Sequence, residues 1–150
     1  MAVGGLRGVG FDRNSELLLV HSSAGRGVID CQTAEKVARD YEEYCGDEIF
    51  MECEGIGPLA GICVRLASIF GGGLIRFTRD DWSIDQVTLD WPIQEVLLFP
   101  PENMLPGVIH REPSVFYKIF RDFQPIFAGF SYTGKTLLIA SSSDIEIWGR

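Results

Sequence analysis

Short runs of aliphatic and aromatic residues, separated by Gly, Pro and Asp, recur along the chain at lengths typical of β-strands. Several runs partly alternate apolar and polar positions, as in Cys63-Val64-Arg65-Leu66. The middle of the chain contains five predicted strands, at residues 49–54, 61–70, 74–78, 83–89 and 95–99. The segment 114–122 (SVFYKIFRD) is short and amphipathic, and it is predicted as one short helix.

An internal repeat relates the two ends of the chain. Residues 10–23 (GFDRNSELLLVHSS) align without gaps on residues 129–142 (GFSYTGKTLLIASS), with Gly, Phe, two Leu and two Ser in common. Each copy predicts a strand that ends at the Phe, a short polar turn, and a second strand rich in aliphatic residues. Because the copies are alike, we expect the two hairpins to lie side by side and to share a core.

The sequence that follows each copy extends the likeness. A second run begins after each pair of serines, VID at 28–30 and IEIW at 145–148. This order of hairpin and following strand resembles a blade of the WD-repeat β-propellers, over roughly the first 40 and last 25 residues. Propellers need at least four blades of about 40 to 45 residues each, which exceeds the 150 residues present. The resemblance therefore implies an all-β fold of antiparallel blade-like sheets, packed as a sandwich or partial propeller in one domain.

The stretch 28–48 (VIDCQTAEKVARDYEEYCGDE) supports two interpretations. As a helix, it places Ala34, Val37, Ala38, Tyr41 and Tyr44 at helical spacing. As part of a blade, it forms a strand at 28–30, a turn at 31–35 and a returning strand at 36–39. The repeat favours the second interpretation, and in both of them residues 40–48 project as an acidic segment.

Composition limits the kind of protein and the kind of partner. Hydrophobic residues make up 46% of the chain, and no apolar run approaches the roughly 18 residues that a membrane-spanning helix requires. The formal net charge is −8, which disfavours nucleic acid and favours a basic protein as partner. Residues 30–54 contain nine acids and two basic residues, Lys36 and Arg39, so this window alone carries a net charge of −7.

Cysteine spacing and the N-terminal residues bear on the compartment. Four cysteines at irregular spacing predict buried free thiols in a reducing compartment, with no metal site and no cofactor: Cys31, Cys45, Cys53 and Cys63. The first eleven residues lack the basic and apolar regions of a secretion signal. We therefore expect a cytoplasmic protein.

Catalytic motifs are weak in this sequence. Residues 129–136 (GFSYTGKT) satisfy the phosphate-loop expression, but the strand-like residues that follow favour a turn between two strands. Acids lie beside tryptophans between Asp80 and Asp90, which keeps a hydrolase open as an alternative. A nucleophile elbow is missing, His21 occupies a predicted strand, and His110 a predicted loop.

The acidic window is the strongest candidate site. It combines negative charge with aromatic residues and Met51, which are types enriched in protein interfaces. The predicted partner-binding residues are Asp40, Tyr41, Glu42, Glu43, Tyr44, Asp47, Glu48, Glu52 and Glu54. Small acidic proteins with this profile resemble the immunity proteins that neutralise basic bacterial toxins. We expect a non-enzymatic protein-binding protein, with an adaptor module of a larger complex as the other alternative.

Overall fold

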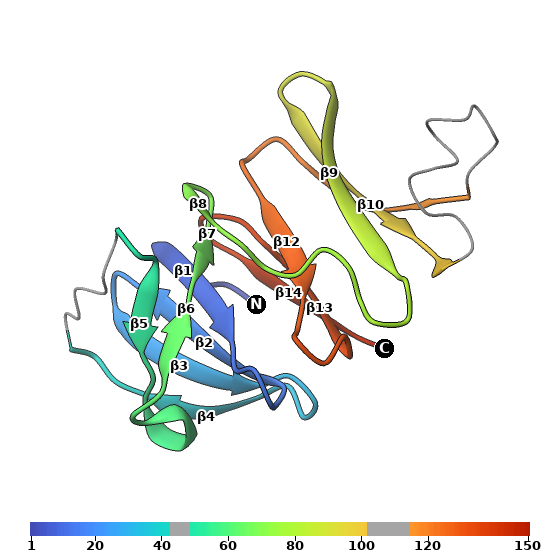
Figure 1. Cartoon of the computed structure of the whole chain (residues 1–150). Helices are drawn as coiled ribbons and strands as arrows, with labels where there is room; N and C mark the ends of the chain where they lie inside the picture. The colour runs from blue at the N-terminus through green and yellow to red at the C-terminus, as the bar shows by residue number, and fades with distance from the viewer. Residues whose placement is uncertain (43–48, 102–114) are drawn as a thin grey trace.

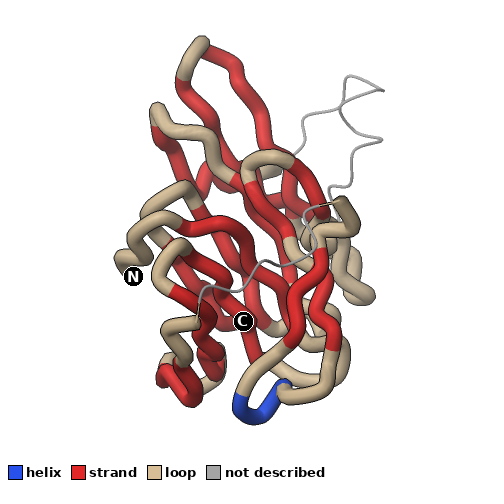
Figure 2. Tube along the Cα trace, turned by 90° about the vertical axis from the view of Figure 1, so that its left-hand side faces the viewer, coloured by secondary structure: helices blue, strands red, loops and turns tan. Residues whose placement is uncertain are grey.

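The computed structural model describes residues 1–42, 49–101 and 115–150, and the regular structure of these residues is almost entirely antiparallel β-sheet (Figures 1 and 2). The one helix among them is a single 3-10 turn, η1 (Gly57–Leu59). The structure thus confirms the predicted all-β fold class. No helix in the described ranges has the length and apolar character that crossing a membrane requires.

The largest sheet has six strands and contains the first repeat. Its core is a meander in which each strand pairs with the next. β1 also pairs with the short strand β7, and β7 pairs in turn with β8. In spatial order the strands are β4 (Glu35–Arg39), β3 (Gly25–Asp30), β2 (Leu17–Ser22), β1 (Leu6–Phe11), β7 (Ala67–Ser68) and β8 (Gly71–Gly72).

Three smaller sheets complete the fold. The second repeat forms a three-stranded sheet of β12 (Phe127–Phe130), β13 (Thr136–Ala140) and β14 (Ile145–Gly149). Another three-stranded sheet contains β11 (Tyr117–Asp122), β10 (Ile93–Phe99) and β9 (Ser83–Asp90). The fourth sheet is the hairpin of β5 (Glu52–Glu54) and β6 (Cys63–Arg65).

The two repeats have the same hydrogen-bonding register. Phe11 pairs with Leu18 in the first hairpin, and Phe130 pairs with Leu137 in the second. The third strands also match, because Leu17 lies opposite Asp30 and the corresponding Thr136 lies opposite Gly149. The gap-free correspondence seen in the sequence therefore extends through β3 and β14.

The repeats stack head to tail. The side of β2 that carries Leu18 and Val20 packs against Leu138 and Ala140 of β13. The opposite side of the second repeat, which carries residues such as Ile139, packs against the β9–β11 sheet. The far side of the first repeat is covered by the β5–β6 hairpin, so Figure 1 shows four layers in the order β5–β6, β1–β4, β12–β14 and β9–β11. The two ends of the chain share a core, as predicted.

Residues 28–39 adopt the strand interpretation. β3 and β4 pair through Val28 and Ala38, and a turn joins them in which Ala34 has a left-handed φ of 59°. The helical alternative is wrong, because β3 already pairs with β2 and offers its other edge to β4.

The predicted helix at 114–122 is also wrong, since Tyr117–Asp122 forms β11. Its sequence is rich in β-branched and aromatic residues, which suit a strand at the edge of a sheet. β11 pairs with β10, and Lys118 reaches the buried carboxylate of Glu95 at 2.8 Å. Pairing with β10 thus outweighs the local helical spacing.

Candidate functional site

The acidic window lies beside the β5–β6 hairpin, at one end of the stack. Asp40, Tyr41 and Glu42 follow β4, whereas Glu52 and Glu54 belong to β5. Four predicted members of the site lie outside the described residues: Glu43, Tyr44, Asp47 and Glu48. The other five predicted members lie within the described residues.

Asp40 is held by Arg26 of β3. The backbone N–H of Arg26 donates to Oδ1 of Asp40 at 2.9 Å, and its Nε and Nη2 donate to Oδ2 at 2.9 and 2.7 Å. The side chain of Arg26 is 9% exposed and that of Asp40 is 22% exposed. The guanidinium bonds to Oδ2 and the backbone N–H bonds to Oδ1, so both carboxylate oxygens are held and the pair fixes where the chain leaves β4.

The pKa of Asp40 reflects this pairing. Burial raises the pKa of the carboxyl group, but hydrogen bonds from Arg26 and its positive charge outweigh burial, and the pKa lies below its usual value. The side chain of Asp40 therefore does not project freely from the fold, and its part in partner binding stays a prediction. Its carboxylate is already occupied within the protein.

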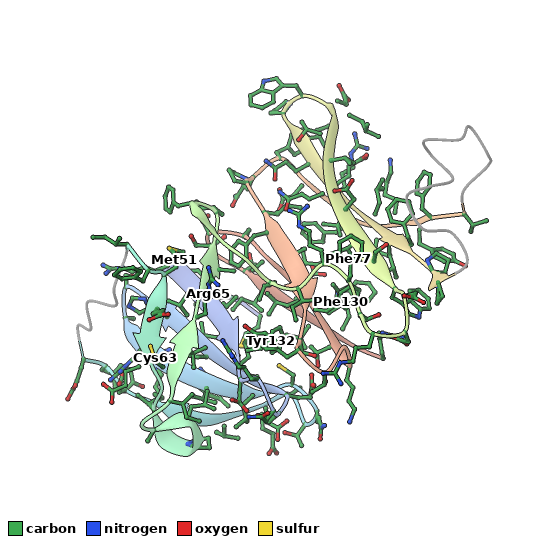
Figure 3. All side chains as sticks on the ribbon, viewed as in Figure 1. Met51, Cys63, Arg65, Phe77, Phe130 and Tyr132 are labelled. Carbon is green, nitrogen blue, oxygen red and sulfur yellow. The ribbon has the colours of Figure 1, made fainter. Side chains whose placement is uncertain are left out.

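The same arginine connects the start of the window to β5. Nη1 of Arg26 donates to the carbonyl oxygen of Glu54 at 2.9 Å. Strand alternation buries Cys53 between the exposed residues Glu52 and Glu54. Both carboxylates therefore face outward from a backbone that Arg26 holds in place. In Figure 3, Met51 and Cys63 mark the two ends of this hairpin.

Exposed apolar side chains occur in the same stretch of the chain. Tyr41 is 81% exposed, Ile49 is 87% exposed and Phe50 is 67% exposed. The guanidinium of Arg39 lies over the ring of Tyr41, with 5.0 Å between its Cζ and the ring centroid. Sequence reasoning had singled out Tyr41 and Phe50 but not Ile49, whose exposure becomes clear only once β5 is seen to begin at residue 52.

These residues define one surface. The acidic–aromatic surface consists of Tyr41, Glu42, Ile49, Phe50, Glu52 and Glu54. Each of its members is exposed. Tyr41 and Glu42 follow Asp40, and Glu52 and Glu54 belong to β5, and Arg26 bonds to both of these segments. Ile49 and Phe50 lie in the turn that leads into β5.

The cysteines do not form a shared site. Cys31 and Cys53 are buried free thiols, as predicted, whereas Cys63 is exposed. Burial raises the pKa of Cys31 to about 12 and that of Cys53 to about 11. Cys45 lies outside the described residues. Within the described part of the chain, no group of three or more His, Cys, Asp or Glu residues is placed to hold a metal ion.

The acids from Asp80 to Asp90 are spread along β9 and the turn before it. Asp80 lies before this strand and is paired with Arg150, Asp85 faces Arg76 at 3.5 Å, and Asp90 ends the strand. Eight residues of strand separate the two ends by roughly 25 Å at about 3.3 Å per residue. This placement lends no support to a pair of catalytic carboxylates.

The phosphate-loop match at residues 129–136 spans β12, a turn and β13. Its Thr136 hydroxyl donates to the buried carboxylate of Glu16, and Ser131 donates to the same carboxylate at 3.2 Å. The segment is thus the turn between two strands that the sequence favoured. His21 lies buried in β2, also as predicted, and His110 lies outside the described residues.

Comparisons with family models, with curated proteins and with solved structures found no match.

Proposed function

We propose that this chain is a non-enzymatic binding protein that takes hold of a basic protein through the acidic–aromatic surface. The observation that carries the proposal is that residues 41–54 contain three exposed acids, Glu42, Glu52 and Glu54, and three exposed large apolar residues. Neutralisation of a basic toxin, as immunity proteins achieve, is the form of binding that this chemistry suits best. The buried free thiols Cys31 and Cys53 support a reducing, cytoplasmic location as part of the proposal.

The two kinds of side chain would contribute differently to binding. Carboxylates of one sign accelerate the encounter with a cationic protein, and this effect weakens as salt is added. Tyr41, Ile49 and Phe50 would supply apolar area to bury, and aromatic residues are frequent among the residues that carry most of the binding energy. Steering and burial would then act on adjacent parts of one surface.

The framework beneath the surface supports this use. Arg26 is bonded to Asp40 and to the carbonyl of Glu54, so the segments that present Tyr41 and Glu54 are ordered before any partner arrives. A surface that is ordered in advance loses less conformational entropy on binding.

The proposal can be tested by affinity capture from the native host with residue-resolved crosslinking from position 50. Wild-type protein should capture and crosslink a basic protein, and capture should weaken as salt rises. The triple variant Glu42→Gln, Glu52→Gln, Glu54→Gln should slow association by about tenfold or more, and Phe50→Ser should accelerate dissociation. Loss of the partner's own activity in the complex would identify neutralisation.

A charge-matched control separates this surface from overall charge. The triple variant Asp81→Asn, Asp90→Asn, Asp144→Asn removes the same charge from exposed positions elsewhere. It should capture the partner as wild type does, and circular dichroism should show that all variants are folded. Equal loss of capture in both triple variants would rule out a specific role for the acidic–aromatic surface.

A further inference from the structure

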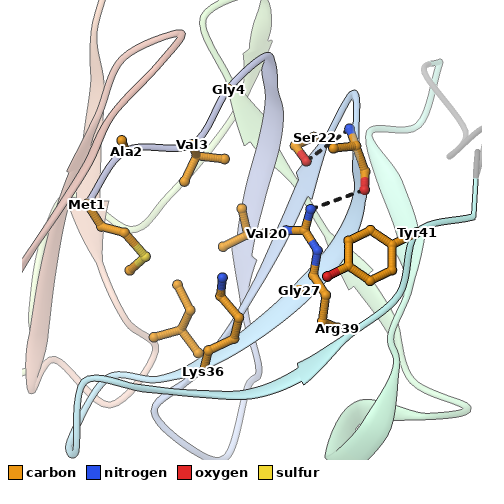
Figure 4. A pocket seen from close by; sticks show the side chains of 12 residues that line it. Met1, Ala2, Val3, Gly4, Val20, Ser22, Gly27, Lys36, Arg39 and Tyr41 are labelled. Atoms are coloured by element: carbon orange, nitrogen blue, oxygen red, sulfur yellow. Dashed lines mark hydrogen bonds between the residues drawn. The ribbon is translucent and has the colours of Figure 1, made fainter.

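A cavity of about 350 Å³ lies between the N-terminal residues and the outer strands of the first repeat (Figure 4). Its apolar lining includes Met1, Val3, Val20 and Ile29, and Gly27 of β3 contributes no side chain to it. The cavity follows from the stacking of the repeats. β4 has no strand opposite it in the three-stranded sheet of the second repeat, so far as the chain is described.

Two cations enter this cavity from β4. Figure 4 shows Lys36 and Arg39 beside the apolar lining, with Tyr41 at the rim. Both belong to the window of net charge −7, in which they are the only basic residues. Across the described ranges, neither has a carboxylate within ion-pair distance, because Asp40 is bonded to Arg26 instead.

The guanidinium of Arg39 is only partly satisfied. Its Nη2 donates to the carbonyl oxygen of Ala24 at 3.1 Å, and its plane stacks on Tyr41. Its Nε is buried and lacks a hydrogen-bond partner among the described residues. A buried donor without an acceptor is rare in native proteins.

We propose that this cavity binds a small organic anion, with a carboxylate or phosphate group at Lys36 and Arg39 and an apolar body against Val20 and Ile29. The volume lies within the range of about 300 to 1,000 Å³ that small-molecule sites occupy. The lining combines apolar side chains with convergent polar groups, and small-molecule sites also combine the two. The guanidinium is suited to both oxyanions, because its planar donors match carboxylate and phosphate geometry.

Gly27 provides a direct way to block the site. A Cβ at this position would have no atom closer than 3.7 Å, and the residue does not have a positive φ. Gly27→Leu should therefore be accepted by the strand while its side chain occupies the cavity. This variant leaves both cations and the whole acidic–aromatic surface unchanged.

The test is an NMR titration with octanoate, phenylacetate and phenyl phosphate, compared with 1-octanol and inorganic phosphate. At least one of the three organic anions should produce saturable shifts at the amides of Gly27 and Lys36. The matched alcohol and inorganic phosphate should bind at least about tenfold more weakly, since each lacks one half of the recognised ligand. Failure of all three organic anions, or equal binding of the alcohol or of inorganic phosphate, would overturn the proposal.

Variants then locate the site. Lys36→Gln combined with Arg39→Gln should weaken binding by about tenfold or more, and Gly27→Leu should abolish it. Arg7→Gln removes an exposed cation elsewhere in the first repeat and should leave the affinity unchanged. Unaltered binding in folded Gly27→Leu would place the ligand elsewhere and overturn the assignment. Partner capture by this variant should equal that of wild type, so the anion site and the protein-binding function can fail separately.

Discussion

The carboxylate of Glu16 accepts a hydrogen bond from the hydroxyl group of Thr136, which joins the turn of the first repeat to the turn of the second. Ser131 and Thr133 donate to the same carboxylate. The residue at the position of Glu16 in the second repeat is Lys135, which is exposed. The turn of the first repeat faces the second repeat, whereas Lys135 in the turn of the second repeat is exposed.

Glu16 should accordingly contribute to stability far more than Lys135. Glu16→Ala removes the acceptor of three hydroxyl groups, two of which belong to buried residues, and should lower the free energy of unfolding by about 2 to 4 kcal/mol. Lys135→Ala should change it by less than about 0.5 kcal/mol. Equilibrium unfolding in urea measures both values. Equal effects of the two substitutions would show that water replaces the carboxylate between the turns.

The first glycine of each repeat, Gly10 or Gly129, should not tolerate a side chain. A Cβ on Gly10 would come closer than 3.0 Å to the carbonyl oxygen of Arg65, and one on Gly129 would meet Leu74 as closely. Gly10→Ala and Gly129→Ala should each destabilise the fold by about 2 kcal/mol or more, because the connecting segment must move away.

Gly149→Ala is the matched control for this prediction. It also lies in a strand of a repeat, but nothing lies within 4 Å of its Cβ position. Thermal unfolding should give a midpoint near that of wild type for this variant and clearly lower midpoints for the other two. A midpoint for Gly10→Ala equal to that of Gly149→Ala would contradict the close approach of β6 to β1.

The hairpins could be predicted from the sequence because their strands and turns follow from neighbouring residues. The repeat at residues 10–23 and 129–142 predicted both hairpins, and matching apolar positions predicted that they share a core. The head-to-tail order could not be predicted, because either face of an apolar strand can turn toward its neighbour until the other layers are placed. The resemblance to WD-repeat blades stays a prediction.

The site was less predictable, because contacts distant in sequence decide which charges are available. Nothing near Asp40 in the sequence indicates that Arg26, fourteen residues earlier, takes up its carboxylate. The pairing requires β3 and β4 to lie side by side, which only the fold reveals. The same limitation applies to Tyr117–Asp122, where the edge of β10 decides between strand and helix.

Substitution of Asp40 should therefore change how the free energy of unfolding depends on pH, and it should leave partner binding unchanged. The pKa of Asp40 is lowered in the folded protein, so folding favours the carboxylate. Its contribution is fully present above the unfolded pKa of about 3.9, and it is lost as pH falls through the lower folded pKa. Asp40→Asn should lower the free energy of unfolding by about 2 kcal/mol near neutral pH, below the range for a fully buried pair because the side chain is 22% exposed.

Urea unfolding at pH values from about 7 down to about 3 tests this, with pH values chosen around the unfolded pKa. The difference between wild type and Asp40→Asn should stay constant down to about pH 5 and shrink below about pH 4. Glu42→Gln, the exposed neighbouring acid, should match wild type throughout. A difference that is unchanged at the lowest pH would show that Asp40 acts through shape and not through charge, whereas reduced partner capture by folded Asp40→Asn would return this residue to the binding surface.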